Sequence, residues 1–372
     1  MKLSPDMWIP PIERKPEGVP KIVALGGDGI GPEVVEATLR CIEALGLPLE
    51  ISRPIHGTAA VNELGNPLPD ETKRTIDAAD AVLFGAIDTS VGNAKAALLY
   101  LRFDLEMYAN LRPVTSVDCI PSIIGGDNTN LVIVRELTEG LYPGREGQLS
   151  DLTSKWPEYR DGRGKELPKD GAFSLRVMTP EAIERIVKFG IRLAKHRKDK
   201  GYSRGHISLV HKANMLRVGD GLFVDICRKH IEESGLSYDE IYVDEAARRL
   251  VAEPQNYDVI VTSNLFGDVL SDVASEAMGG MPMVPSAAIG DTGAYFESCH
   301  GSAPDIVGTG KANPAATILS GSMMLSYLGE TEAAARLIDA TLGTIRSGIK
   351  TGDLGGSATT DSFTDAICER LR

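Results

Sequence analysis

The sequence predicts an α/β fold that is divided into two lobes. Short aliphatic runs at residues 21–25, 81–87, 131–134, 206–210 and 257–262 alternate with stretches of helical periodicity. These runs are almost entirely apolar, which is typical of strands in a sheet covered on both faces. With 372 residues the chain is long enough to bury more than one hydrophobic core.

The charge of the chain excludes several classes of partner. Its formal net charge is -13 at pH 7, so its mean field repels phosphates and predicts no nucleic-acid or anionic-membrane surface. No apolar run approaches the roughly 20 residues that span a bilayer. An anionic small molecule would therefore need a locally basic pocket.

The five cysteines are scattered and never form a CxxC pair, which favours neither a disulfide framework nor a zinc site. Residues 1–20 contain prolines and charges in place of the apolar core of a signal peptide, and we expect them to form an irregular arm. These observations together predict a cytoplasmic protein.

A glycine-rich turn, GGDGIG, follows the first aliphatic run and leads into a helical pattern that opens at Pro32. In a dinucleotide-binding fingerprint that began at Gly27, a glycine would stand where this chain has Pro32. The sequence thus argues against a Rossmann assignment and predicts a tight turn before a helix.

The clearest predicted helix begins after the N-cap Thr179, has Pro180 at its first position and ends before Gly201. Its last turn, residues 195–198, is basic, and we expect it to lie on a solvated face, where it complements the helix dipole. The polar segment 150–174 predicts a projecting arm or long loop.

Asp268 and Asp272 are one helical turn apart, so their carboxylates would repel each other on one helix face. A divalent cation such as Mg²⁺ or Mn²⁺ would reverse the sign of that interaction. On spacing alone, two solvated acids are the better interpretation.

Arg102, Arg112 and Arg135 each lie beside apolar or aromatic residues, and buried guanidinium groups need anionic partners. Ion pairs with Glu106 or Glu136 would satisfy them, and so would a dicarboxylate ligand.

Two further residues are candidate proton-transfer groups. Lys212 would emerge where the run 206–210 ends, and Tyr142 stands in EGLYPG. The ordinary interpretation is a solvated lysine and a packed turn aromatic, whereas placement in a cleft would make either one reactive.

Seven ordered segments add up to more than these separate signals. They are GDGIGPEV (27–34), LR (101–102) ten residues before the LR of NLRP (110–113), VRELTEGLY (134–142), HKAN (211–214), YVDEA (242–246), NLFGDVLSD (264–272) and HGSAPDIVGTGKANP (300–314). With these segments the chain resembles the β-decarboxylating dehydrogenases, the family of isopropylmalate, isocitrate and homoisocitrate dehydrogenases.

The resemblance implies a two-lobed isocitrate/isopropylmalate dehydrogenase-like fold that is distinct from the Rossmann fold. Residues 1–107 and 280–372 would form a discontinuous cofactor-binding lobe. Residues 108–279 would form a central lobe with the dimer interface and the arm at about 150–174. The implied assembly is a homodimer whose active sites are shared between subunits.

By the same resemblance, Arg102, Arg112 and Arg135 would bind the carboxylates of a small dicarboxylate or tricarboxylate. Asp268 and Asp272, with Asp244 of the partner subunit, would hold Mg²⁺ or Mn²⁺. Lys212 of the partner subunit, assisted by Asn214, would accept the proton of the substrate hydroxyl, and Tyr142 would protonate the product carbon.

The resemblance also implies NAD as cofactor, because Asp305 stands where NAD-using members carry a carboxylate that repels a 2′-phosphate. NADP-using members carry lysine and tyrosine at the positions of Asp305 and Ile306. The implied cofactor contacts are Ile30, Glu297, His300, Gly301, Ser302, Ala303, Asp305, Ile306 and Asn313.

Residues just before Arg102 would contact the substituent on substrate C3. Leu98 and Leu99 favour an alkyl group, which ranks 3-isopropylmalate first and predicts formation of 2-oxo-4-methylpentanoate in leucine biosynthesis. Lys95 could pair with an anionic substituent, so homoisocitrate or isocitrate ranks second and a tartrate- or malate-type acid third. The alternative that is not an enzyme is a non-catalytic regulatory subunit. The chain keeps the tyrosine, the lysine and the aspartates of the family, which favours an enzyme.

Overall fold

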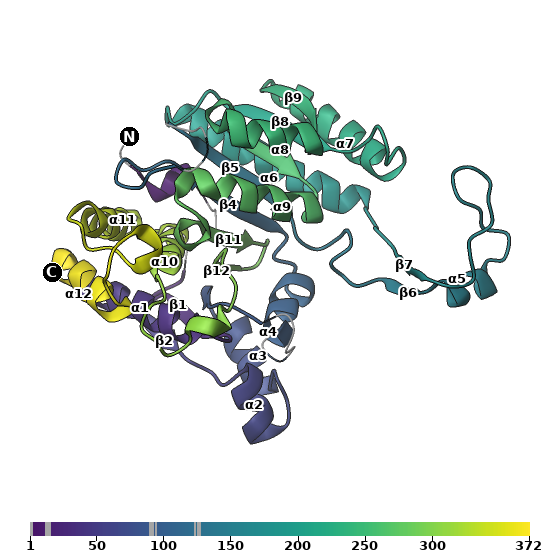
Figure 1. Ribbon diagram of the computed structural model, residues 1–372. Helices are drawn as coiled ribbons and strands as arrows, with labels where there is room; N and C mark the ends of the chain where they lie inside the picture. The colour runs from purple at the N-terminus through teal and green to yellow at the C-terminus, as the bar shows by residue number, and fades with distance from the viewer. Residues whose placement is uncertain (1–2, 12–15, 89–92, 94, 123, 125–127) are drawn as a thin grey trace.

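The protein is built around one continuous ten-stranded sheet flanked by helices (Figure 1). The computed structural model describes residues 3–11, 16–88, 93, 95–122, 124 and 128–372. The strand order is β2-β1-β3-β12-β11-β4-β5-β10-β8-β9. The α/β class predicted from the aliphatic runs is confirmed.

Both ends of the chain contribute to one half of the sheet. Strand β12 pairs in parallel with β3, although about 210 residues separate them in the sequence, and β11 pairs with β12 in antiparallel fashion. The elements of this half are β1 (Lys21–Leu25), β2 (Glu50–Ser52), β3 (Ala81–Phe84), β11 (Pro285–Ile289), β12 (Ala294–Ser298), α1 (Gly31–Ala44), α2 (Gly57–Leu64), α3 (Asp70–Asp77), α4 (Lys95–Leu99), α10 (Ala315–Tyr327), α11 (Thr331–Arg346) and α12 (Thr360–Leu371).

The middle of the chain forms the other half, and the two halves join where β11 pairs with β4. Strands β5, β10, β8 and β9 run parallel to one another, whereas β4 is antiparallel to β5. The elements are β4 (Ala109–Thr115), β5 (Asn130–Glu136), β8 (His206–His211), β9 (Ser237–Tyr242), β10 (Val259–Thr262), α6 (Pro180–Asp199), α7 (Gly219–Ser234), α8 (Val243–Ala252) and α9 (Asn264–Ser275).

The predicted helix after Thr179 is present as α6, and the Thr179 hydroxyl accepts a hydrogen bond from the backbone of Ala182. The predicted turn between β1 and α1 is also present. Gly29 has φ +58°, and a Cβ there would lie 2.0 Å from the carbonyl oxygen of Ser302. The glycine therefore permits close contact between this turn and the segment around Ser302.

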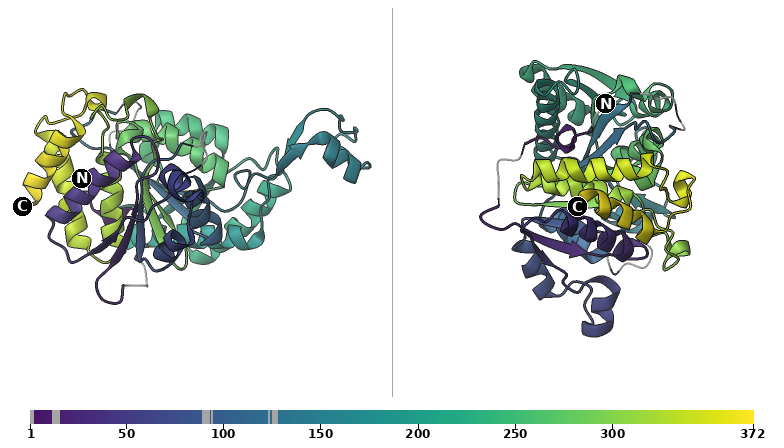
Figure 2. Two further views of the ribbon diagram at one scale, coloured as in Figure 1. Left: turned by 90° about the horizontal axis from the view of Figure 1, so that it is seen from below. Right: turned by 90° about the vertical axis from the view of Figure 1, so that its left-hand side faces the viewer.

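The arm predicted at 150–174 is a projecting hairpin that starts slightly earlier. Strands β6 (Glu146–Gln148) and β7 (Ala172–Ser174) pair in antiparallel fashion and enclose α5 (Leu149–Lys155). Figures 1 and 2 show it extending away from the body of the protein. Trp156 and Tyr159 on this arm are 53% and 57% exposed.

The start of the chain is packed into the body, so our expectation of an irregular arm was wrong for residues 3–9. Trp8 is fully buried, and its indole donates a hydrogen bond of 3.2 Å to the hydroxyl of Thr115 on β4. The 3₁₀ turn at Pro5–Met7 packs against α10 and α11. The segment thus joins the central half of the sheet to the last helices.

The basic last turn of α6 explains part of this packing. Arg197 is fully buried rather than solvated, because it pairs with Asp258 at 2.8 Å and also donates to the carbonyl of Met7. His196 contacts the carbonyl of Asp6 at 2.9 Å. Two of the four residues predicted to face solvent therefore hold the N-terminal segment.

A search of the described residues finds no helix with the length and apolarity needed to cross a membrane.

We predict that Trp8→Ala lowers the free energy of unfolding by about 3–5 kcal/mol, because it removes a large buried aromatic side chain. Thermal and urea unfolding of the purified protein would measure the change. Trp156→Ala is the matched control, since that tryptophan is about half exposed on the arm. Equal stability of the two variants would contradict the packing role of the N-terminal segment.

Candidate active site

A cavity of about 580 Å³ lies at the junction of the two halves of the sheet. Residues from α4 and the π-helical turn after it, from β4 and β5, from α9 and from β12 line it. Three of the lining side chains are the predicted arginines Arg102, Arg112 and Arg135. The structure therefore brings together residues that are distant in the sequence.

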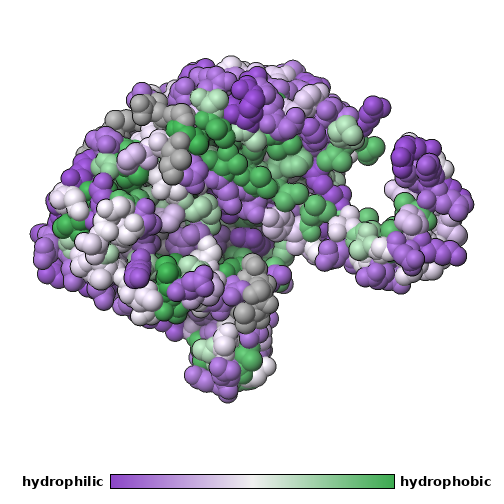
Figure 3. All heavy atoms as spheres, viewed as in Figure 1, coloured by the Kyte–Doolittle hydropathy of each residue, from purple (hydrophilic) through white to green (hydrophobic). Residues whose placement is uncertain are grey.

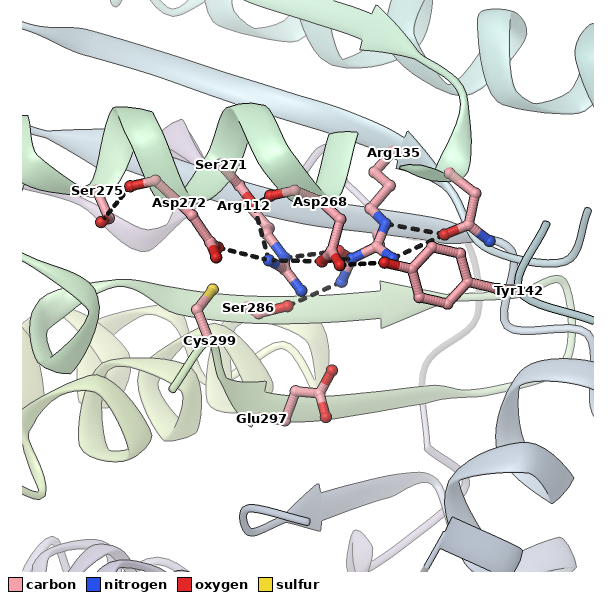
Figure 4. Close-up of polar contacts among 12 residues, drawn as sticks. Arg112, Arg135, Tyr142, Asp268, Ser271, Asp272, Ser275, Ser286, Glu297 and Cys299 are labelled. Atoms are coloured by element: carbon pink, nitrogen blue, oxygen red, sulfur yellow. Dashed lines mark hydrogen bonds and ion pairs between the residues drawn. The ribbon is translucent and has the colours of Figure 1, made fainter. Parts of the chain in front are cut away.

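Arg112 and Arg135 share one carboxylate, that of Asp268 (Figure 4). Arg135 forms an ion pair with Asp268, and Arg112 lies 3.3 Å from the same oxygen. The Arg135 side chain is 1% exposed and the Arg112 side chain 7%. Burial, reinforced by the neighbouring Arg112, lowers the pKa of Arg135 to about 10.

Neutral side chains complete the coordination of these two guanidinium groups. Asn264 accepts two hydrogen bonds from Arg135, at 3.1 and 2.7 Å. Ser271 accepts one from Arg112 at 2.7 Å, and Asn110 accepts another at 3.0 Å. Among the ion pairs of the described residues, Asp268 is therefore the one carboxylate that lies within 3.5 Å of the guanidinium group of Arg112 or Arg135.

Arg102 lies on the π-helical turn at Tyr100–Asp104 and faces strand β12. It donates to the hydroxyl of Tyr295 at 2.7 Å and pairs with Glu297 at 3.2 Å. Burial opposes the charge on Arg102, but Tyr295 and Glu297 outweigh it and raise its pKa. Glu297, implied as a cofactor contact, lines this cavity and not the one described below.

The alternative partners considered for the arginines are engaged elsewhere. Glu136 accepts hydrogen bonds from Thr138 and from the backbone of Glu139, and Glu106 lies 3.4 Å from Arg185. Ion pairing with either glutamate therefore does not explain the burial of the three arginines.

Tyr142 extends over this cluster. Its hydroxyl donates a hydrogen bond to Asp268, and the Arg135 guanidinium lies 5.1 Å from the centre of its ring. Burial and then the hydrogen bond to Asp268 raise the pKa of Tyr142. The phenol therefore keeps its proton at neutral pH and can act as an acid.

Asp268 and Asp272 lie on successive turns of α9 and both point toward Arg112 (Figure 4). Arg135 and Arg112 outweigh the effect of burial and lower the pKa of Asp268. Burial raises the pKa of Asp272, and the charge on Asp268 adds to that effect while Arg112 opposes it. Two carboxylates with such spacing supply the oxygen donors that Mg²⁺ and Mn²⁺ prefer.

Lys212 and Asp244 form a separate pair. The Lys212 ammonium contacts the Asp244 carboxylate, which is 68% exposed, and lies 5.8 Å from the ring of Tyr242. Asn214 is exposed in the turn after Lys212. Within the described part of one chain, no group of three metal-binding side chains joins Asp244 to Asp268 and Asp272.

The wall of the cavity next to Arg102 is largely apolar. Leu98 is buried and Leu99 is half-buried, and Ile87 and Phe103 line the same space. Lys95, at the start of α4, is an exposed cation on this wall. The wall thus offers an alkyl surface with one cation at its edge.

A second cavity of about 780 Å³ adjoins the first, and His300 and Gly301 line both. Of the residues implied as cofactor contacts, Ile30, His300, Gly301, Ala303, Ile306 and Asn313 line it. Ser302 and Asp305 belong to the same segment; the Ser302 carbonyl accepts the backbone N–H of Ile30, and Asp305 is exposed.

Two observations mark this cavity as a candidate ligand site. The Nε2 atom of His300 is buried and has no hydrogen-bond partner among the described residues. Ala303 has φ +40°, an unfavourable conformation for a residue with a side chain, and such strain tends to occur at ligand sites.

Several polar residues of the site were not anticipated from the sequence. Tyr295, Asn110, Asn264 and Ser271 hold the arginines, Cys299 lines the first cavity, and Asp353 lines the second, where it accepts a hydrogen bond from Asn313. Asn264 and Ser271 stand in the same segment as Asp268 and could have been found there. Tyr295 reaches Arg102 only through the pairing of distant strands.

The fold is that of the isocitrate/isopropylmalate class of dehydrogenases. The model of the isocitrate/isopropylmalate dehydrogenase family matches residues 21–367, so the chain belongs to this family of decarboxylating dehydrogenases. The recognition of the family from sequence motifs is confirmed.

Individual relatives have different substrates in their names. The chain is 41% identical to 3-isopropylmalate/3-methylmalate dehydrogenase of Methanocaldococcus jannaschii, over 95% of this chain and 99% of that one. It is 42% identical to isocitrate/homoisocitrate dehydrogenase of Thermus thermophilus, over 95% and 98%. The crystal structure of isocitrate dehydrogenase from Methylococcus capsulatus matches with TM-score 0.83 at 37% identity, over 95% of this chain and 100% of that one.

We predict that Asp268→Asn, measured in the presence of a chelator, lowers the free energy of unfolding by about 1–3 kcal/mol at pH 6. The folded pKa of Asp268 lies below the unfolded value, so its contribution is complete above the unfolded pKa and is lost as pH falls through the folded pKa. The difference between wild type and variant should shrink below about pH 4.

Thermal unfolding across a pH series would test this prediction. Asp118→Asn is the control, because Asp118 pairs with Arg346 at an exposed site. A stability difference for Asp268→Asn that stays constant down to pH 3 would contradict the ion-pair assignment.

Proposed function

We propose that the protein catalyses the NAD-dependent and Mg²⁺- or Mn²⁺-dependent oxidative decarboxylation of 3-isopropylmalate to 2-oxo-4-methylpentanoate, a reaction of leucine biosynthesis. The observation that carries the proposal is a single cavity lined by three arginines and by an apolar wall. The free thiols of all five cysteines are compatible with a reducing cytoplasm.

The arginines support a diacid as substrate. Arg112 and Arg135 share a single carboxylate within 3.5 Å, that of Asp268. A carboxylate of a bound ligand would therefore reduce the repulsion between the two guanidinium groups. Arg102, which pairs with Glu297 on β12, also lines the cavity and could hold a second carboxylate. The proposed substrate places one carboxylate at each position.

The apolar wall supports an alkyl group on C3. Burying an isopropyl group against Leu98, Leu99 and Phe103 contributes a few kcal/mol at most, about 0.8 kcal/mol for each carbon. Lys95 on the same wall favours a second candidate, homoisocitrate or isocitrate, whose extra carboxylate it could pair with. A malate- or tartrate-type acid leaves the wall uncovered and ranks third.

The cation and the nicotinamide fit the residues of the two cavities. Asp268 and Asp272, with Asp244 of the partner subunit, would hold the cation, and the second cavity, where the Nε2 atom of His300 has no partner among the described residues, would take NAD. When bound, the cation supplies positive charge next to the reacting oxygens and NAD supplies the hydride acceptor. Asp305 disfavours NADP, because its carboxylate would repel a 2′-phosphate.

The remaining chemistry belongs to side chains of the protein. Arg102, Arg112 and Arg135 fix the substrate so that its C2 hydrogen faces the second cavity. Lys212 of the partner subunit, in its neutral amine form, would accept the proton from the C2 hydroxyl as the hydride leaves, with Asn214 beside it. After loss of CO₂, Tyr142 donates its proton to the carbon that carried the carboxylate.

A homodimer would complete the site. Exposed apolar side chains lie on the turn that follows Lys212, on α8, which carries Asp244, and on α9, and Figure 3 shows hydrophobic residues gathered over α8 and α9. Met215, Val218, Val251 and Val269 are 71%, 89%, 48% and 54% exposed. Such a patch is typical of an interface between subunits. We propose that the central half of the sheet forms the dimer-making lobe and the other half the cofactor-binding lobe.

We predict metal-dependent reduction of NAD with 3-isopropylmalate, with kcat/KM at least about tenfold above that for homoisocitrate, isocitrate, tartrate or malate. A panel of these acids, followed by NADH absorbance with and without chelator, would measure it. A higher kcat/KM for homoisocitrate or isocitrate would favour the second candidate, and Lys95→Ala should then lower that value. Absence of turnover with every acid would favour a regulatory subunit, and comparable kcat/KM with NAD and NADP would refute the cofactor choice.

We predict that Tyr142→Phe and Lys212→Met each lower turnover by about 10²–10⁴-fold, because each removes a proton-transfer group. Tyr142→Phe should impair steps after oxidation, whereas Lys212→Met should impair hydride transfer. Mixing the two inactive variants tests whether Lys212 serves the partner's site. A hybrid dimer then contains one intact site, and random exchange of subunits restores about a quarter of wild-type activity.

The control for this experiment is a protein that carries both substitutions in one chain, mixed with wild type. Activity from the mixed single variants requires each site to combine Tyr142 of one subunit with Lys212 of the other. If unfolding and refolding the mixture restores none, the two residues act within one chain and the shared site is wrong.

A further inference from the structure

Arg176 and Asp220 form a buried ion pair, and neither residue lines either of the two cavities. The Asp220 side chain is 1% exposed and that of Arg176 is 17% exposed. Asp220 lies in the first turn of α7, and Arg176 follows the arm. A buried charge pair that the proposed chemistry does not use needs a reason for its retention.

On one side, the pair fixes the residue that carries the proposed base. Asp220 accepts a hydrogen bond of 2.6 Å from the backbone N–H of Lys212, the first residue after β8. A hydrogen bond to a buried carboxylate is stronger than one to a neutral acceptor. The backbone of Lys212 is therefore held independently of its side chain, which contacts Asp244.

On the other side, Arg176 reaches the start of α9. It donates a hydrogen bond of 2.9 Å to the hydroxyl of Ser263, which precedes the helix, and its guanidinium lies 5.0 Å from the ring centre of Phe266. The next residue, Asn264, binds Arg135, and the same helix carries Asp268.

A third connection leads to the loop of Tyr142. Val177, next to Arg176, accepts a hydrogen bond of 2.9 Å from the backbone N–H of Gly140, two residues before Tyr142. Arg176 thus lies where the segments of Lys212, Asp268 and Tyr142 meet.

We propose that Arg176 and Asp220 are positioning residues that hold these three segments in one frame, so that the geometry of Lys212 is set together with that of α9 and Tyr142. The inference rests on the proposed roles of Lys212 and Tyr142. In a dimer with shared sites, Asp268 serves the site of its own subunit and Lys212 serves the site of the partner subunit. The Arg176–Asp220 pair would therefore connect the two sites.

The test compares two buried aspartates that have the same kind of contacts. Asp258 pairs with the fully buried Arg197 and accepts the backbone N–H of His206 at 2.8 Å, but contacts no residue of the site. Asp258→Asn is therefore a matched control for Asp220→Asn. Both variants should lose thermal stability to a similar extent.

The two variants should differ in catalysis. We expect Asp220→Asn to lower kcat about 10–100-fold, because a small displacement of a proton-transfer group is costly, while KM for NAD changes less than about twofold. The primary deuterium isotope effect on kcat, measured with substrate deuterated at C2, should rise because hydride transfer becomes slower. Asp258→Asn should leave kcat and the isotope effect at wild-type values.

A second variant covers the case in which Asp220→Asn does not fold. Arg176→Lys keeps a positive charge opposite Asp220 but cannot also reach Ser263, and we expect a fall in kcat of about 3–10-fold. A folded Asp220→Asn or Arg176→Lys protein with the kcat and isotope effect of Asp258→Asn would overturn the proposal.

Hydrogen exchange separates this proposal from the proposed function. Asp220→Asn should accelerate exchange of the Lys212 amide, and Asp258→Asn should not, whether or not a substrate is known. If wild type turned over none of the acids, the proposed function would fail on its own. Unchanged exchange at Lys212 in Asp220→Asn would overturn the positioning role.

Discussion

The structure depends on one electrostatic constraint, the burial of two guanidinium groups that share a carboxylate. Arg112 and Arg135 are nearly inaccessible, and Asp268 lies between them. Two like charges so close in a medium of low polarity repel each other, which is why burial and Arg112 lower the pKa of Arg135 to about 10. The cavity therefore carries a positive charge in a chain whose net charge is -13. This local excess of positive charge is the physical reason for proposing an acid as the ligand.

The sheet register creates this arrangement. Strands β4 and β5 pair so that Asn110 lies opposite Arg135 and Arg112 lies opposite Ile133. Side chains alternate between faces along a strand, so Arg112 and Arg135 emerge on the same face, two positions apart. A slip of one residue would turn one arginine to the other face. Asn110 supports the register because it binds both Arg112 and the hydroxyl of Ser286 on β11.

Local sequence signals predicted the elements better than the contacts between them. The aliphatic runs and the Thr179–Pro180 helix start depend on neighbours in the chain, and the structure contains both. Spacing alone favoured solvated acids at Asp268 and Asp272; only the family motifs indicated a site, because the arginines that face these acids come from other strands. The burial of Trp8 and Arg197 was missed for the same reason. Arg197 stands in a basic run typical of a solvated helix end, and its partner Asp258 is 61 residues away.

The Lys212–Asp244 ion pair differs from the buried arginine cluster because it lies at the surface. The carboxylate of Asp244 is 68% exposed, and a surface ion pair of this kind contributes about 0–1 kcal/mol. Turning Asp244 away from Lys212 therefore costs little, whereas Asp268 is held by buried arginines. In the proposed dimer, a carboxylate with so weak a partner could turn into the site of a neighbouring subunit at little cost in stability. Under that proposal, the buried arginines hold Asp268 and so fix the place of the site, and Asp244 is the acid that a second subunit would add.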